Sequence, residues 1–314
     1  MAILLAWPVP LWLKQAQWPS RAPGAALILW QALGISGGLA LVTAPLTWGL
    51  QPFGPGIISA LTELWSVFQT QGPEAVVEDE RWHPLGLAAI TLGLLLFAHL
   101  ALVLLHTAYR TFRQRKKHRE FVEILSATLQ EDQHGLVDGA TGTGKTRVLP
   151  VEHPLAYCLP AINQPLTIVS RGLLNELTTP QLSAVLAHES AHLIQRHDLL
   201  RLAFQAWHKA APWFPATGVA VTEVTELTEI MADEYALRTH KRDDLMTALA
   251  HTVEATDSPA QSTNSNDEAP DADLNSRRIK RLLNPDKPLG SCRVSLVIIL
   301  AVLLVTVPAA VSLI

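Results

Sequence analysis

The chain has 314 residues, of which 49% are hydrophobic and only 17% are charged, and its formal net charge is -4. Ordinary soluble domains carry about 25% charged residues, so this composition predicts membrane-embedded segments. The small negative charge gives no support for a nucleic-acid partner. The two cysteines, Cys158 and Cys292, are too far apart in sequence to form a paired metal motif, which favours a reducing compartment.

The sequence predicts three membrane spans. Each contains no Asp, Glu, Lys or Arg and is long enough to cross a bilayer as a helix: residues 25–50, 85–109 and 294–314. The short apolar segment in residues 1–24 contains Pro8 and Pro10, which interrupt a helix, so we expect an interfacial segment or a shortened first span there. Residues 57–68 are amphipathic and are expected at the membrane interface.

Two features inside the spans bear on helix packing. Gly34, Gly37 and Gly38 lack side chains and would let another helix approach closely. His99 lies near the middle of the second span, and a histidine inside a membrane is a candidate functional residue. A neutral histidine also serves in packing or hydrogen bonding, and we favour that role for His99.

A basic cluster predicts the orientation of the chain. Six lysines and arginines fall within residues 110–119, directly after the second span, and positive charge beside a span marks the cytoplasmic side. The acidic segment 51–84 then lies outside, and the basic residues from Arg277 to Arg293 lie inside. Nucleic-acid binding is the alternative interpretation of the cluster. We expect a multi-pass cell-membrane protein whose cytoplasmic domain comprises residues 110–290.

Within this domain the sequence predicts helices and a few short strands. The basic cluster continues as a helix through residues 121–130, and strands are expected at 156–159 and 166–170. A further helix is expected to begin at Thr179 and Pro180, which suit a helix start, and to extend to about Ala210.

Beyond Pro212 and Pro215, which break the helical pattern, another helix is expected from about Val221 to Arg242. Residues 253–276 are polar, acidic and poor in large apolar side chains. Such a segment buries too little surface to order itself, so the sequence predicts a flexible linker.

The segment from Val185 to Ile194 contains an HExxH motif, His188-Glu189-Ser190-Ala191-His192. Residues four apart lie on the same face of a helix, so His188 and His192 can reach one zinc ion. Glu189 can reach a water on that metal and act as its general base. The motif alone arises by chance, but here small residues separate the histidines and the helix has a capped start.

A catalytic zinc usually takes three protein ligands and leaves one position for water. Residues 223–236 supply carboxylates on a second expected helix, with Glu226, Glu229 and Asp233 along one face. We expect Glu229, which precedes apolar residues, to be the third ligand. Asp233, one turn further on, would orient a histidine or Glu229. A solvated acidic face is the alternative interpretation.

This set of residues predicts hydrolysis of a peptide bond. Zinc lowers the pKa of a water toward about 7, and Glu189 takes its proton and later passes it to the leaving amine. An extended substrate would pair with one of the two predicted strands. The sequence does not choose among four candidates for stabilising the oxyanion: Tyr157, Tyr235, His197 and His251.

Residues 139–146 fit the phosphate-loop pattern GxxxxGK[ST] in full. Such a loop needs a buried strand before it and a helix after it. A polar segment precedes this one, and Pro150 and Pro154 fall where the helix should run. We therefore expect a glycine- and threonine-rich loop and no nucleotide binding.

The HExxH segment with Arg196 to Leu200, preceded by residues 156–160 and 170–174, resembles the integral-membrane zinc peptidases of the BlaR/MecR type, most of all their short actinobacterial members. The segment from Glu229 to Asp233 resembles the ExxxD signature shared with the HtpX and CAAX-prenyl-protease group, in which the Glu is the third zinc ligand. Residues 276–282 loosely resemble a C-terminal segment of these families.

The resemblance implies a mainly α membrane protein, with transmembrane helices and a cytoplasmic zincin-like (gluzincin) α+β peptidase domain that carries HExxH on its active-site helix. The expected partners are the lipid bilayer and a protein or peptide substrate. The BlaR/MecR resemblance implies that the substrate is a transcriptional repressor, and the HtpX resemblance implies damaged membrane proteins.

This sequence also departs from the BlaR/MecR sensors. They carry an extracellular β-lactam-binding domain after their last span, whereas this sequence ends at Ile314, so antibiotic sensing is not expected. The first span is short, which suggests a truncated start. A non-catalytic membrane scaffold with a structural zinc is an alternative of a different class. The presence of Glu189 argues against it, because a structural site needs no base.

Overall fold

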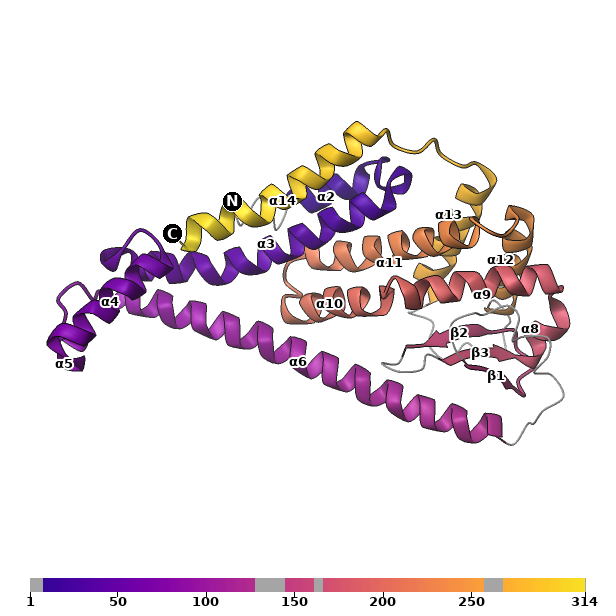
Figure 1. The fold of residues 1–314 in the computed structure, drawn as a ribbon, viewed down its shortest axis with the longest axis horizontal. Coiled ribbons are helices and arrows are strands. Elements are labelled where there is room, and N and C mark those ends of the chain that lie inside the picture. Colours follow the sequence, from indigo (N-terminus) through magenta and orange to yellow (C-terminus); the bar gives the residue numbers. More distant parts are fainter. Residues whose placement is uncertain (1–7, 128–144, 161–165, 257–267, 314) are drawn as a thin grey trace. The chain divides into compact units, whose positions relative to one another are not determined.

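The structure is a computed structural model that describes residues 8–127, 145–160, 166–256 and 268–313. These residues are mainly helical, with one three-stranded sheet (Figure 1). The chain divides into two compact units. The first unit comprises residues 1–107, 203–224 and 289–314, and the second comprises residues 108–202 and 225–288.

The first unit contains the most apolar helices of the chain. Among the described residues, three helices are long and apolar enough to cross a membrane: Pro23–Phe53, Pro84–Leu125 and Ser291–Leu313. They correspond to the three predicted spans. The helices of this part of the chain are α2 (Pro8–Gln15), η1 (Pro19–Arg21), α3 (Pro23–Leu50), η2 (Gln51–Phe53), α4 (Ile57–Gln71), α5 (Pro73–Val77), the first part of α6 (Pro84–Ala127), and α14 (Ser291–Leu313).

Helices α3 and α14 pack side by side (Figure 1). Ser36 Oγ donates to the Leu304 carbonyl at 2.7 Å, and Thr43 and Ser312 share a hydrogen bond of 3.1 Å. Both residue numbers rise along the contact, so the two helices are parallel. The paired hydroxyls satisfy polar groups that lipid could not.

Glycines permit the close helix contacts of this unit. Gly49 of α3 lies against the backbone of Gly86 in α6, so close that a Cβ on Gly49 would fall 2.5 Å from the Gly86 carbonyl oxygen. Gly34 and Gly37 face the ring of Trp207, whose helix α10 (His197–Ala210) enters this unit with its second half. The predicted close packing is therefore confirmed at Gly34 and Gly37, whereas a Cβ on Gly38 would meet nothing within 4 Å.

His99 has a hydrogen-bonding role. Its Nε2–H donates to the carbonyl of Ala210 at 2.9 Å, and its ring stacks near Trp213. Ala210 is the last residue of α10, where carbonyls have no partner within the helix. This contact fits the packing or hydrogen-bonding role that the sequence favours for His99.

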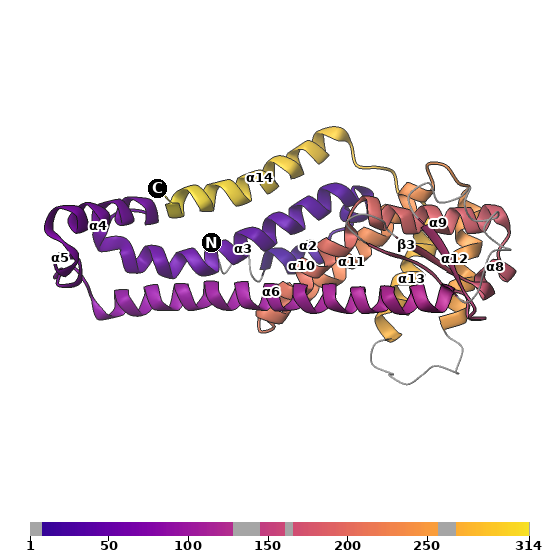
Figure 2. The same cartoon turned by 60° about the horizontal axis from the view of Figure 1, so that its bottom comes forward.

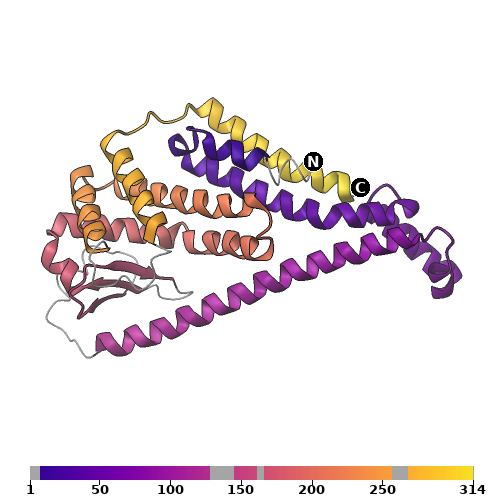
Figure 3. The ribbon, with the colours of Figure 1, turned by 180° about the vertical axis from the view of Figure 1, so that it is seen from behind.

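The second unit is built around a small sheet in the order β1-β3-β2. Strand β3 (Leu166–Ser170) is central and fully buried. It pairs in parallel with β1 (Lys145–Leu149) and antiparallel with β2 (Ala156–Leu159). The predicted strands 156–159 and 166–170 are confirmed, and β1 was not predicted. Strand β2 is therefore an edge of the sheet, next to helix α9 (Thr179–Ile194) (Figures 1 and 3).

The second unit also contains the following helices: the second half of α6, α8 (Arg171–Glu176), α9, the start of α10, the second half of α11 (Pro215–Ala236), α12 (Arg242–Thr256) and α13 (Glu268–Leu283). Leu173, Leu182 and Leu186 form a core cluster with Val169 of the sheet. This packing fixes α9 against the sheet through its apolar face and leaves the face with the two histidines turned toward α11 and α13.

Several helix boundaries differ from the prediction. The helix expected from about Val221 to Arg242 is α11, which begins at Pro215 and ends at Ala236, because a proline is tolerated in the first turn of a helix. The helix that carries HExxH ends at Ile194, because Arg196 adopts a left-handed backbone conformation with φ of 52° before α10 begins. Helices also occupy both ends of the predicted linker 253–276, since α12 extends to Thr256 and α13 begins at Glu268. Side-chain contacts from Arg277 and Arg278 to α11 hold α13, and composition alone does not show such contacts.

The phosphate-loop pattern falls largely on residues 139–144, which lie outside the described residues. Lys145 and Thr146 begin strand β1. In a phosphate-binding loop these two positions open a helix, whose N-terminus binds the phosphate. The described part of the pattern therefore has the wrong local structure for nucleotide binding.

Candidate metal centre

Helix α9 presents the two histidines of the HExxH motif. Its start is fixed by a capping box, in which the backbone N–H of Thr178 donates to Gln181 Oε1, and by Pro180 in the first turn. The N-cap is thus Thr178, one residue before the prediction. His188 and His192 lie one turn apart, and their Nε2 atoms are 3.2 Å apart.

Helix α11 brings a carboxylate to the same point. Glu229 Oε2 lies 3.3 Å from His188 Nε2, and Glu229 Oε1 lies 3.4 Å from His192 Nε2. The three residues form a group that could hold a metal ion. The structure therefore brings together the residues that the sequence selects as ligands from two helices.

Each histidine is oriented from its second ring nitrogen. His188 Nδ1 lies 2.9 Å from Asp233 Oδ1, so the N–H there donates to a carboxylate that is 2% exposed. His192 Nδ1 lies 2.9 Å from His197 Nδ1, and His197 Nε2 lies 3.1 Å from Gln195 Oε1. Since Gln195 Oε1 only accepts, His197 donates to it from Nε2 and accepts from His192 through Nδ1. Nε2 of each ring therefore faces Glu229 and is the nitrogen through which that histidine would bind a metal.

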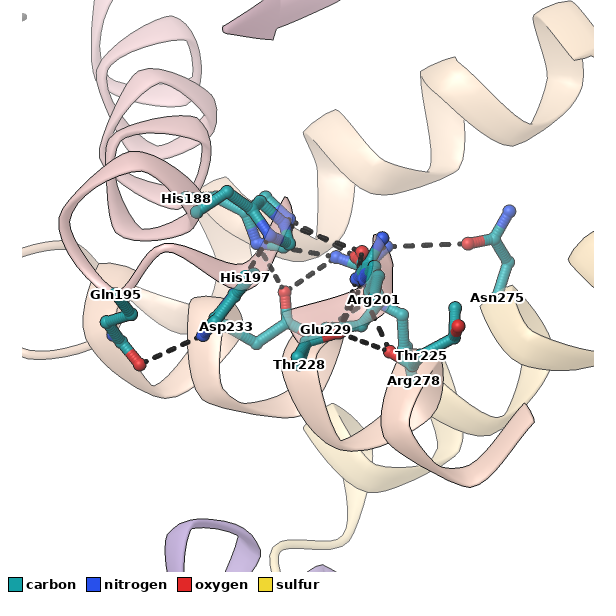
Figure 4. A network of polar contacts seen from close by, with 11 residues as sticks. His188, Gln195, His197, Arg201, Thr225, Thr228, Glu229, Asp233, Asn275 and Arg278 are labelled. Carbon is teal, nitrogen blue, oxygen red and sulfur yellow. Dashed lines mark hydrogen bonds and ion pairs between the residues drawn. The ribbon is translucent and has the colours of Figure 1, made fainter. Parts of the chain in front are cut away.

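Two arginines flank the carboxylates, as Figure 4 shows. Arg278 of α13 donates to Asp233 through Nη2 at 2.7 Å and through Nε at 3.0 Å, and its Nη1 lies 3.1 Å from Glu229 Oε2. Arg201 of α10 reaches Glu229 Oε1 at 2.7 Å and also donates to Thr228. Glu229 is held from both sides, so its carboxylate has a defined orientation.

The buried charges perturb one another strongly. Burial lowers the pKa of His188, but hydrogen bonds to Asp233 and Glu229 outweigh it and raise the pKa to about 9. Burial lowers the pKa of His192 to about 3 and that of His197 to about 4. Burial alone would raise the pKa of Glu229, yet the hydrogen bond with His188 and the charge of Arg278 hold it well below its usual range. Glu229 is therefore ionised, and the rings of His192 and His197 are neutral.

The side chain of Glu189 extends from α9 to the edge strand β2 of the sheet. Its carboxylate accepts a hydrogen bond from the backbone N–H of Cys158 in β2. Burial raises its pKa to about 7, more than the charge of His188 lowers it. A carboxylate with a pKa near neutrality can both accept and return a proton, which is what general base catalysis requires.

The other residues singled out in the sequence are placed elsewhere or play other parts. Glu226 pairs with Arg277 at 2.9 Å, and His251 faces Glu176 at 3.9 Å. Tyr157 bonds to His118, and the ring of Tyr235 lies under the guanidinium of Arg238. Of the four oxyanion candidates, His197 contacts a predicted ligand, and this contact orients His192.

Sequence reasoning assigned no role to Arg201 or Arg278. Arg278 lies 45 residues after Asp233, with which it pairs, so no local pattern connects them. The one available signal was the loose family likeness of residues 276–282, which contains Arg278. Arg201 lies on an ordinary amphipathic helix, and its sequence context gives no sign of the contact with Glu229.

Two histidines one turn apart on one helix, with a carboxylate from a second helix, define a candidate metal centre of the metallopeptidase class. Residues 128–286, half of the chain, match the model of peptidase family M48, and the chain belongs to that family. Membership implies a metallopeptidase that acts on protein or peptide substrates. No curated protein matches the chain closely enough to add to this assignment.

Proposed function

We propose that this protein is a membrane-bound zinc metalloendopeptidase whose metal is held by His188, His192 and Glu229. The observation that carries the proposal is the close approach of the three side chains. The two Nε2 atoms lie 3.2 Å apart, and the Glu229 carboxylate lies 3.3 Å from His188 Nε2 through Oε2 and 3.4 Å from His192 Nε2 through Oε1. A tetrahedral zinc with bonds of about 2.0–2.1 Å places its ligand atoms about 3.3 Å apart. Two imidazoles, one carboxylate and an open fourth position also suit zinc chemically.

Zinc in this site would supply Lewis acidity, which makes a water acidic near neutral pH and polarises a peptide carbonyl. Glu189 is the general base, because its burial gives it a pKa of about 7. The Cys158 N–H holds its carboxylate in place. After accepting the proton of the attacking water, Glu189 delivers it to the nitrogen of the leaving amine.

The edge strand β2 is the proposed docking site for an extended substrate. The sequence left two strands open for this role, but β3 is central in the sheet and β2 lies at an edge next to α9. An extended peptide added beside β2 would use main-chain hydrogen bonds and therefore accept varied sequences. Its carbonyls would run past Glu189, which contacts the same strand.

The proposed topology places the peptidase on the cytoplasmic side of the membrane. Three helices are apolar enough to cross it, and basic residues flank the second and third at 110–119 and from Arg277 to Arg293. The parallel contact of α3 with α14 supports this, because both helices would then begin inside. A site there would meet either cytoplasmic repressors or the cytoplasmic segments of membrane proteins, the two substrate classes that the BlaR/MecR and HtpX likenesses imply.

A non-catalytic scaffold with a structural zinc is the competing function. Structural sites are usually closed by four protein ligands, whereas this cluster offers three, with the carboxylate of Glu189 beside them. A structural site has no use for a carboxylate with a pKa near 7. The geometry therefore favours catalysis.

The test compares wild type with Glu189→Gln, measuring zinc content and cleavage of casein or of the chain itself. We expect one zinc per chain in both proteins, and cleavage by the wild type only. Ser190→Ala is the matched control. It changes the next residue, whose hydroxyl donates within the helix to the Ala187 carbonyl, and it should retain activity. Zinc in both proteins with no cleavage by the wild type would contradict the proposal.

A further inference from the structure

The second half of α6 belongs to the same compact unit as the candidate metal centre. Helix α6 continues without interruption from the predicted span to Ala127 (Figure 2). Val122, which is 1% exposed, packs in a core cluster with Leu149, Leu159 and Ile168 of the sheet. This apolar contact anchors α6 against β1, β2 and β3.

Two polar side chains on the same face of α6 contact elements that carry the site. Arg115 Nη1 pairs with Asp198 Oδ2 of α10 at 2.5 Å, and His118 Nε2 bonds to the hydroxyl of Tyr157 in β2 at 2.8 Å. Positions 115, 118 and 122 are spaced i, i+3 and i+7, so they form one stripe along the helix. One helix face therefore contacts α10, β2 and the sheet core together.

The contact with Asp198 lies next to the support of a predicted ligand. Asp198 follows His197, which is 1% exposed and accepts the hydrogen bond from His192 Nδ1. His197 is brought back onto His192 by the turn at Arg196, whose φ of 52° is sparsely populated by residues other than glycine. A turn of this kind persists only where the surrounding contacts hold it, and the ion pair from Arg115 is such a contact.

The contact with Tyr157 lies next to the support of the general base. Tyr157 precedes Cys158, whose backbone N–H donates to the Glu189 carboxylate. In the sheet, Tyr157 is opposite Ile168 and Cys158 is opposite Thr167, so β2 is held on one side by β3. On the α6 side, β2 is held by the apolar contact of Leu159 with Val122 and by the hydrogen bond between His118 and Tyr157.

We propose that Arg115 and His118 are positioning residues of the peptidase, through which α6 holds His192 and Glu189 in the positions that the proposed reaction needs. Arg115 acts on His192 through Asp198 and His197, and His118 acts on Glu189 through Tyr157 and β2. The inference rests on the proposed function, because it assigns roles relative to the proposed metal and base. It differs from a general stabilising role for α6, since each contact controls a different measurable property.

The first test measures zinc affinity by competition with a chelator for Arg115→Gln, Asp198→Asn and the double variant. Loss of the residues that support a ligand histidine typically costs about 10–100-fold in metal affinity, and we expect the lower end because Arg115 acts through two intermediates. Each single variant should therefore bind zinc about 10-fold more weakly, and the double variant no more weakly than either. Unchanged affinity in the single variants, or additive losses in the double, would overturn the role of Arg115.

The second test separates the two contacts. Tyr157→Phe keeps the packed ring and removes only the hydroxyl that His118 contacts, so its fold is retained. We expect its zinc affinity to equal that of the wild type, while kcat falls about 10-fold and KM changes little, because a small displacement of the base slows the chemical step. A loss of zinc, or an unchanged kcat, would contradict the role of His118.

Lys117→Gln is the matched control for both tests. It removes the same charge as Arg115→Gln from the same turn of α6, but Lys117 is exposed. Zinc affinity and kcat should be unchanged. Failure of the proposed function would show as a wild type without zinc or cleavage, whereas failure of this inference would leave the wild type active and the α6 variants like it.

Discussion

Replacing Asp233 by Asn tests the network behind the candidate metal centre, because it removes one charge and almost no volume. Asp233 is 2% exposed and accepts three hydrogen bonds, one from His188 and two from Arg278. A bond to a charged acceptor contributes about 1 kcal/mol more than one to a neutral acceptor, so the three together predict a loss of about 3 kcal/mol in the free energy of unfolding. That is the lower end of about 3–5 kcal/mol for breaking a buried ion pair, as expected when Arg278 keeps Glu229 at 3.1 Å.

The same substitution should weaken zinc binding by about 10–100-fold, because His188 loses the carboxylate that orients its ring and increases its basicity. Unfolding is followed in mixed detergent micelles, and zinc affinity by chelator competition. Glu234→Gln is the control. It alters the next residue of α11, whose ion pair with Arg281 is half exposed at the glutamate, and should cost about 1 kcal/mol or less with no change in zinc affinity. Wild-type zinc affinity and stability in Asp233→Asn would refute the reasoning.

Three further predictions concern other parts of the chain. His188 has a pKa of about 9 without metal, so it is protonated at pH 7.5 and zinc must displace that proton. Calorimetry in two buffers of different ionisation enthalpy should show release of about one proton per zinc. Zinc binding without proton release would contradict this account. Lys145→Ala should leave activity unchanged, and dependence of activity on a nucleotide would show that the phosphate-loop pattern is functional. His99→Phe should lower stability by about 1 kcal/mol through loss of the bond to Ala210, with activity retained; lost activity at full stability would give His99 a functional role.

The two histidines that touch the proposed metal could be selected from sequence because their spacing is local. Two histidines four apart on one helix share a face whatever surrounds them. Glu229 was selected as a carboxylate on the next expected helix and through the likeness to the ExxxD signature. Strands 156–159 and 166–170 were likewise evident, as short runs between helix-breaking segments. These features depend on short-range periodicity, which survives without knowledge of tertiary contacts.

The supporting residues could not be selected in the same way. Arg278 reaches Asp233 across 45 residues, and Arg201 reaches Glu229 across 28. The end of α9 was missed because helical periodicity continues past Arg196, and nothing in its residue type marks a left-handed conformation. The start of α13 was assigned to a linker on composition, although tertiary ion pairs to α11 hold that helix. In each case the decisive interaction is long-range.

The central claim is that His188, His192 and Glu229 hold a catalytic zinc. Metal analysis of the purified protein after gel filtration, for the wild type and Glu229→Ala, tests it most directly. We predict one zinc per chain in the wild type and loss of the metal in the variant. Full zinc occupancy in Glu229→Ala would contradict the account, because the third ligand would then lie elsewhere.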